Sequence, residues 1–165
     1  MNRPLLLIDI DGVISLFGFD PGRPPVGTFI SVDGIVHFLS SVAAEQLLAL
    51  SDEFELAWCS GWEEKADEYL PFALGVPDGL PHVEFEGEGN GDGRHWKLAS
   101  IDRFAGERAL AWIDDGHDPS CEHWATTRSA PTLLVTTDPA AGLTPSHTQI
   151  LTAWARELTR HDTRP

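Results

Sequence analysis

Basic residues are scarce in this chain. Its 165 residues include 11 lysines and arginines against 26 aspartates and glutamates, which gives a formal net charge of -15. A field of that sign repels nucleic acid at long range and favours solubility. The shortage argues against broad binding to phosphate backbones, which needs many positive charges. It does not exclude a small phosphate ester, because local charge and a bound cation decide that interaction.

Cysteines and long apolar runs are also few. The two cysteines, Cys59 and Cys121, cannot form a disulfide framework or a metal knuckle, so we expect free thiols in a reducing cytoplasm. No apolar run approaches the ~20 residues that cross a bilayer. The first residues lack the apolar region and cleavage site of a signal peptide, so we expect a cytoplasmic protein with no membrane segment.

Apolar strand-like runs alternate with helical patterns along the chain, without an internal repeat or a dividing linker. We expect strands near residues 4–10, 54–60, 82–85, 109–114 and 132–137, and helices near 40–51, 62–74, 95–105, 119–129 and 146–160. This alternation predicts an α/β fold, a Rossmann-like three-layer sandwich with a central parallel sheet of about five strands. The length fits a single domain over residues 1–165.

Two segments interrupt the alternation. Residues 14–38, between the first strand and the first helix, are rich in glycine, proline and phenylalanine and contain Asp33-Gly34 between β-forming residues. That dipeptide is a hairpin signal, so we expect a β-hairpin flap after the first strand. Residues 86–93 are acidic and glycine-rich, and they predict a loop.

The most informative stretch is the first strand, where four apolar residues run into Asp9-Ile10-Asp11-Gly12. Open α/β sheets bind ligands at the carboxyl ends of their strands. Asp9 and Asp11 project on the same side of an extended chain and repel each other unless a cation lies between them. The segment therefore suggests a hard cation such as magnesium, held by oxygen ligands. Taken alone, it is equally compatible with a surface turn.

Three later segments bring further polar groups to the end of a strand or the start of a helix, in the order Ser60-Gly61, Lys97 and Asp114-Asp115. Together with Asp9 and Asp11, this ordered set resembles the haloacid dehalogenase superfamily of phosphohydrolases. The resemblance extends from the first to the last of these motifs. It implies a magnesium-dependent phosphomonoester phosphatase.

The resemblance assigns a role to each motif residue. Asp9 would be the nucleophile that forms an aspartyl-phosphate, and Asp11 the general acid and then the general base. Ser60 would bind a phosphate oxygen, and Lys97 would pair with the nucleophile and the phosphoryl group. The structural alternatives are a helix cap for Ser60 and a solvated surface charge for Lys97. Substrate contacts are expected from Gly12, Ser60, Gly61, Trp62 and Lys97.

The resemblance implies that magnesium is held by Asp9, by Asp11 through its main-chain carbonyl, and by the acidic residues of the last motif, at the end of the strand near 109–114. Asp114 is the first choice there, with Asp115 direct or through water. Asp118 is an alternative, since Asp114 and Asp118 also match a spacing found in other members, although Asp118-Pro119 equally suits a helix cap. Arg94 and His95 could replace Lys97 if the register differs. Trp62 and Trp96, beside Ser60 and Lys97, could form an aromatic wall that stacks a ring.

The gaps between motifs leave no room for a large cap domain. In the family, an open site of this kind goes with large substrates or with a partner subunit as the lid, so a homo-oligomer is compatible with this interpretation. The segments around Trp58, Trp96 and Trp112 are similar to a capless bacterial group related to phosphatase domains of predicted RNA-repair proteins. That similarity makes a phosphorylated nucleic-acid end an alternative to a phosphorylated small molecule, although the net charge disfavours it.

Three other readings belong to different functional classes. A noncatalytic module could keep the fold and bind a phosphorylated ligand or partner. A receiver-like phosphoacceptor would need an aspartate where the middle strand ends in Ser60. A true dehalogenase needs no magnesium, and the acidic pair Asp114-Asp115 speaks against it.

Overall fold

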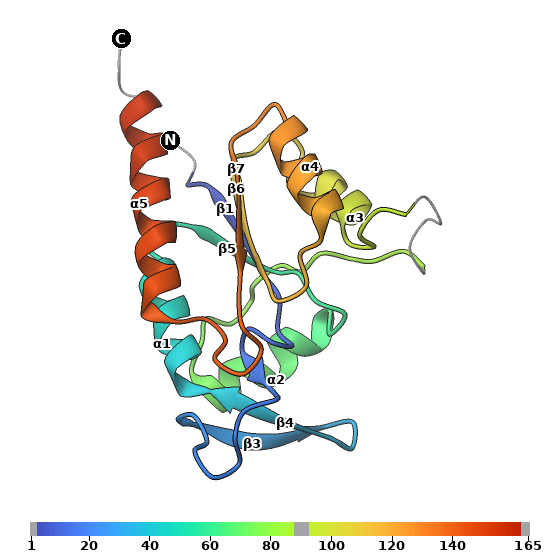
Figure 1. Cartoon of the computed structure of the whole chain (residues 1–165), viewed down its shortest axis with the longest axis vertical. Helices are drawn as coiled ribbons and strands as arrows, with labels where there is room; N and C mark the ends of the chain where they lie inside the picture. The colour runs from blue at the N-terminus through green and yellow to red at the C-terminus, as the bar shows by residue number, and fades with distance from the viewer. Residues whose placement is uncertain (1–2, 88–92, 163–165) are drawn as a thin grey trace.

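A sheet of four parallel strands forms the centre of the computed structural model, which describes residues 3–87 and 93–162 (Figure 1). The strands lie in the order β5-β1-β6-β7, with bounds β1 (Leu5–Ile8), β5 (Glu55–Trp58), β6 (Leu110–Asp114) and β7 (Thr132–Thr136). Strand β1 has a partner on each side, and its Leu7 is in register with Ala57 and Trp112. Because all four strands run in the same direction, their carboxyl ends meet at one edge of the sheet.

Helices cover both faces of the sheet, as Figure 1 shows. They are α1 (Ser41–Leu50), α2 (Glu64–Leu74), α3 (Leu98–Ala105), α4 (Pro119–Thr127) and α5 (Pro145–Asp162). On one face Leu6 and Ile8 of β1 join a core with α1 and α5, and on the other Leu5 and Leu7 join a core with α3 and α4. Side chains alternate along a strand, so a short apolar run supplies both cores. The predicted three-layer α/β sandwich is confirmed, and each helix end lies within three residues of its expected position.

The expected flap follows β1 as a three-stranded antiparallel sheet of order β2-β4-β3. Its strands are β2 (Ser15–Leu16), β3 (Gly27–Val32) and β4 (Ile35–Ser40), and residues 15–40 are called the flap below. Asp33 and Gly34 form the hairpin turn with φ of 52° and 82°. Positive φ at both positions is what a two-residue turn of this hand requires. Among the described residues there is no inserted cap domain.

One of the five expected strands, at residues 82–85, does not form, so the parallel sheet has four strands among the described residues. The chain meets the edge of the sheet there only through a bridge between His82 and Trp58. Trp58 donates its N–H to the Pro81 carbonyl at 2.9 Å, and Val83 donates to the Trp58 carbonyl at 2.8 Å. Pro81 has no N–H to extend the ladder, so the contact does not grow into a strand. The centre of the expected acidic loop, residues 88–92, lies outside the described residues.

Candidate active site

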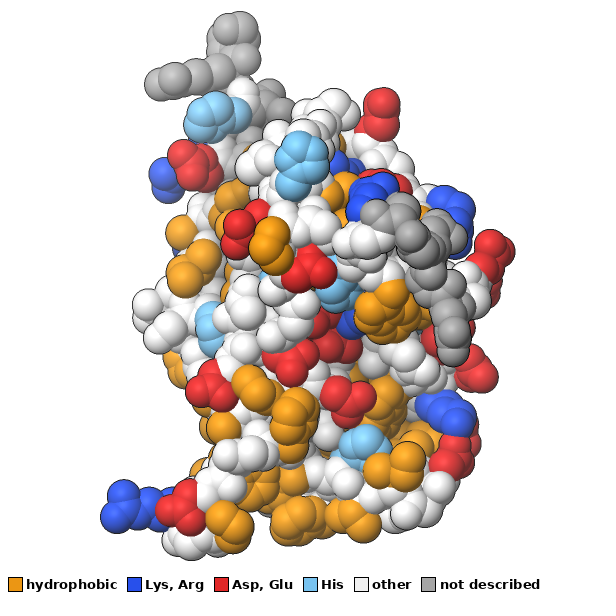
Figure 2. All heavy atoms as spheres, turned by 45° about the vertical axis from the view of Figure 1, so that its right-hand side comes forward, with side chains coloured by type: hydrophobic (Ala, Val, Ile, Leu, Met, Phe, Trp, Pro, Cys, Tyr) orange, Lys and Arg blue, Asp and Glu red, His pale blue; other side chains and the backbone are white. Residues whose placement is uncertain are grey.

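The motif residues meet at the carboxyl edge of the parallel sheet. Asp9 directly follows β1, Ser60 follows β5, and Asp114 ends β6. Since β1 lies between β5 and β6, the three strand ends are neighbours. They open into a cavity of about 360 Å³ that is lined by Asp9, Asp11, Ser60, Gly61, His95, Trp96, Lys97, Asp114, Asp115 and Gly116. Figure 2 shows acidic side chains gathered at the centre of this face, beside basic and hydrophobic ones.

Lys97 lies at the centre of the site and is not a surface charge, because only 5% of its side chain is exposed. Its Nζ lies 2.6 Å from Asp114 Oδ2 and 3.1 Å from Asp9 Oδ1. It also donates to the carbonyl oxygen of Cys59 at 2.9 Å. The chain brings Lys97 here because it immediately precedes α3, whose Leu98 and Ile101 are anchored in the core. One ammonium thus bridges two buried carboxylates.

Burial and charge together set the protonation of these groups. Burial raises the pKa of the Asp9 carboxyl to about 7, while the Lys97 ammonium opposes this rise. Burial alone would lower the pKa of Lys97, but the charges of Asp9 and Asp114 outweigh it and raise that pKa. Lys97 therefore stays cationic. A further cation would stabilise the ionised form of Asp9, because an adjacent positive charge favours a carboxylate.

Three carboxylates are close enough to share a cation. Oxygen atoms of Asp9, Asp114 and Asp115 all lie within 4.8 Å of one another. Burial, followed by the charge of Asp114, raises the pKa of Asp115. Three carboxylates against one ammonium leave an excess of negative charge, and hard oxygen donors suit magnesium. This acidic cluster fits a divalent cation.

Asp118 caps helix α4 and is not part of this acidic cluster. Its Oδ1 accepts the N–H groups of Ser120 at 2.9 Å and Cys121 at 3.1 Å, and so caps α4. A hydrogen bond from the Ser120 hydroxyl is the main reason that the pKa of Asp118 lies below its usual value. Of the two alternatives left open by the sequence, the geometry therefore favours Asp115 as the partner of Asp114.

Gly12 allows the first motif to approach this cluster. Its φ is 79°, and a Cβ at this position would lie 2.3 Å from Asp115 Oδ2. The hydroxyl of Thr137, directly after β7, donates to the Gly12 carbonyl at 2.8 Å and fixes the turn. Thr137 did not stand out in the sequence, because a single threonine after a strand carries no signal of its own.

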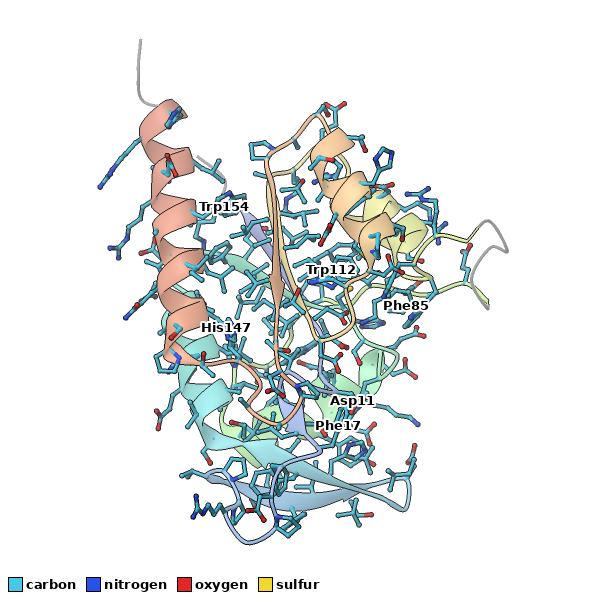
Figure 3. All side chains as sticks on the ribbon, in the orientation of Figure 1. Asp11, Phe17, Phe85, Trp112, His147 and Trp154 are labelled. Carbon is cyan, nitrogen blue, oxygen red and sulfur yellow. The ribbon has the colours of Figure 1, made fainter. Side chains whose placement is uncertain are left out.

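Asp11 lies at the mouth of the site and is half exposed, at 52% of its side chain. Figure 3 shows it between the edge of the sheet and the flap. The Trp62 indole N–H donates to its Oδ2 at 3.1 Å, and Nδ1 of His37 lies 3.6 Å from its Oδ1. The side chain is separate from the acidic cluster, so any metal contact of Asp11 would have to come from its main chain, as the resemblance implies.

His37 is a second site residue, after Thr137, that sequence reasoning missed. It lies on β4 of the flap, accepts or donates a hydrogen bond with the Ser15 hydroxyl at 3.0 Å, and its ring meets the Trp62 ring edge-on at 4.6 Å. Only the pairing of β2 with β4 carries His37 to Asp11, and no spacing of histidines in the sequence indicates it.

Ser60 is buried and lines the cavity beside the exposed Gly61. Its Oγ accepts the N–H of Trp62 at 3.3 Å. Helix α2 begins only at Glu64, after Glu63, so Ser60 lies before the helix and is not its cap. Ser60 therefore lies at the cavity wall, and its contact with a phosphate oxygen stays a prediction. Both cysteines, Cys59 and Cys121, are buried free thiols.

No protein-family model matches the chain, and no curated protein matches it. Among solved structures, one described as "putative 3-deoxy-D-manno-octulosonate 8-phosphate phosphatase from Vibrio cholerae" is similar at 16% identity, with a TM-score of 0.45, over 94% of this chain and 86% of that one. A second crystal structure shares 19% identity, with a TM-score of 0.45, over 97% of this chain and 84% of that one. These similarities are too low to assign a substrate. The layered architecture with its parallel sheet is a Rossmann-like α/β fold.

In the described part of the chain, no helix is long and apolar enough to span a membrane.

Proposed function

We propose that this protein is a magnesium-dependent phosphomonoester phosphatase with Asp9 as its nucleophile. The observation that carries the proposal is the buried ammonium of Lys97 between Asp9 and Asp114, at 3.1 Å and 2.6 Å, on the wall of an open cavity. A phosphate dianion repels a carboxylate nucleophile unless positive charge screens the approach. Lys97 supplies that charge beside the attacking oxygen.

The chemistry follows from the positions of two carboxylates. An Asp9 oxygen attacks phosphorus, so a bond forms between them while the bond from phosphorus to the ester oxygen breaks. Asp11, half exposed at the mouth, gives its proton to the departing alkoxide. It then takes a proton from water, which attacks the aspartyl-phosphate, releases inorganic phosphate and restores Asp9. The Ser60 hydroxyl and Lys97 hold the nonreacting phosphate oxygens.

The acidic cluster gives magnesium its place in this proposal. Asp9, Asp114 and Asp115 would hold the ion, with Asp118 engaged at the start of α4. Bound there, magnesium would neutralise charge on the transferring phosphoryl group. We expect the substrate to be a phosphorylated small molecule, since a net charge of -15 disfavours polyanions.

The test is release of inorganic phosphate from a panel of phosphomonoesters, including nucleotides, sugar phosphates and oligonucleotides phosphorylated at either end. Each is measured with magnesium and with EDTA. We expect magnesium-dependent release that falls to background in Asp9→Asn, whose amide has nearly the same shape but is not a nucleophile. Asp52→Asn, an exposed aspartate outside the cavity, is the matched control.

Three results would count against the proposal in different ways. An unchanged rate in Asp9→Asn would exclude Asp9 as the nucleophile. Release only from oligonucleotide ends would favour the nucleic-acid alternative. A folded protein that binds magnesium and the esters but releases no phosphate would favour a noncatalytic phospho-ligand module.

A further inference from the structure

Trp96 is unusual among the tryptophans of this chain because 46% of its surface is exposed, whereas Trp58 and Trp112 are fully buried. It lies directly before Lys97 and lines the catalytic cavity. It also lines a neighbouring cavity of about 90 Å³, together with Phe85, Glu86, Gly87, Ala99, Ser100 and Arg103. The Trp96 ring therefore forms a wall that both cavities share.

The surroundings of this ring hold it in place. Phe85 packs against it in a tilted arrangement, with ring centroids 4.7 Å apart (Figure 3 labels Phe85). The His95 ring lies nearly parallel to it, at 6.2 Å and 20°. The Lys97 ammonium lies 5.4 Å from its centroid. A ring fixed by such contacts loses little conformational freedom when a ligand covers its open side, which favours binding.

We propose, on the basis of the phosphatase function above, that Trp96 is a stacking platform for the leaving group. The substrate class is then a small phosphomonoester that carries a planar ring joined to its phosphate through a short linker, as in a nucleoside 5′-monophosphate. A phosphate oxygen that replaces one of the three acceptors of the Lys97 ammonium lies about 2.8 Å from its Nζ. Stacked rings lie with centroids about 4.5–7 Å apart. A ring several bonds from phosphorus can satisfy both contacts at once.

Trp62, the other aromatic residue at the mouth, is already engaged. Its indole N–H donates to Asp11 Oδ2 at 3.1 Å, and it packs edge-to-face with the His37 ring, with ring centroids 4.6 Å apart. Trp62 is therefore better suited to orient Asp11 than to receive a ligand ring. The charge of the chain adds a size limit, since its excess of carboxylates repels long polyanions more strongly than a single phosphate ester.

The test compares adenosine 5′-monophosphate with ribose 5-phosphate, which has the same primary ester and lacks the base. We expect the wild-type protein to prefer the nucleotide in kcat/KM. In Trp96→Ala the ratio of the two kcat/KM values should fall about tenfold, because the base then loses the aromatic ring on which it stacks. Trp96→Phe should keep most of the preference. Phe72→Ala, which removes an exposed ring of α2 outside both cavities, is the control and should leave the ratio unchanged.

Binding of both compounds is measured in parallel by calorimetry, so that the two proposals fail separately. Equal ratios in wild type and Trp96→Ala, with phosphate released, would overturn the platform and leave the phosphatase. A base preference in binding that Trp96→Ala abolishes, without phosphate release, would support the platform and overturn the phosphatase. No preference for the nucleotide in either measurement would overturn the platform.

Discussion

Lys97 and Asp114 form a buried ion pair, with Nζ 2.6 Å from Oδ2 and about 5% or less of each side chain exposed. The pair joins the start of α3 to the end of β6, and Asp9 lies on its other side at 3.1 Å. A buried ion pair adds little to the free energy of unfolding compared with apolar side chains of the same shape. Loss of one partner, however, leaves a buried charge uncompensated and is costly. The stability of the fold and the proposed chemistry therefore depend on the same ammonium.

Replacement of Lys97 by methionine should test this dependence. We expect Lys97→Met to lower the free energy of unfolding by about 3–5 kcal/mol, because Asp9 and Asp114 then lack their countercharge. Urea denaturation measures the change, and phosphate release should fall to background. Lys65→Met is the control, since Lys65 pairs with Asp33 on the exposed surface and should change stability little. An unchanged unfolding midpoint for Lys97→Met would mean that the buried pair is dispensable.

From the acidic cluster we predict different effects for Asp114, at the end of β6, and Asp118, at the start of α4. Asp114→Asn should raise the magnesium concentration for half-maximal activity about tenfold or more, because ligand-shell changes commonly cost that much affinity. Asp118→Asn should leave it unchanged, since asparagine caps a helix about as well as aspartate. Phosphate release measured as a function of magnesium concentration distinguishes the two variants. The same curve for Asp114→Asn and the unmodified protein would exclude Asp114 as a ligand.

Alanine substitutions at Gly12 and Gly34 would distinguish the cost of backbone strain from that of a steric conflict in the site. Both have positive φ, of 79° and 82°, but a Cβ at Gly34 meets nothing within 4 Å, whereas at Gly12 it would meet Asp115. We expect Gly34→Ala to cost about 1–2 kcal/mol of stability and to retain activity. Gly12→Ala should cost more and should also reduce turnover by displacing Asp115. The rate of phosphate release per folded molecule measures this difference. Equal rates in the two variants would contradict the steric role given to Gly12.

The partly buried ring of His147 should make the protein less stable at acid pH. Burial lowers its pKa below the usual 6.5, and its Nδ1 accepts the Thr144 N–H at 3.1 Å at the start of α5. The neutral ring is thus preferred in the folded state, so its contribution is complete above pH 6.5 and falls as pH drops toward the folded pKa. Thermal melts from pH 7.5 to 5 should show a smaller decline for His147→Asn than for the unmodified protein. Parallel declines would rule out His147 as a source of the pH dependence.

The arrangement of the layers could be predicted from local patterns. The run Leu5–Ile8 is apolar at every position because both faces of a central parallel strand are covered, and the structure buries all four side chains. Asp33-Gly34 identified the hairpin because few other residues adopt the required φ. Residues 82–85 were misjudged because their composition is typical of a strand, while the missing N–H of Pro81 limits the pairing.

The candidate site was only partly accessible from sequence. Asp9, Ser60, Lys97 and Asp114 follow or precede regular elements in a recognisable order, so their types and spacing marked them. The contact of His37 with Asp11 depends on the register between β2 and β4, which no local pattern encodes. Only the folded chain shows that Asp118 caps α4, whereas Asp115 lies beside Asp9 and Asp114.

By itself, the sequence determined the alternation of strands and helices, the flap, and the residues with suitable chemistry, because periodicity, turn residues and charge act over short stretches of chain. Tertiary structure alone decided that Lys97 is buried between two carboxylates, that Asp115 and not Asp118 joins the acidic cluster, and that Trp96 remains exposed at the cavity. Those outcomes depend on which distant segments pack together. Burial then sets the pKa of each charged group and the accessibility of each ring.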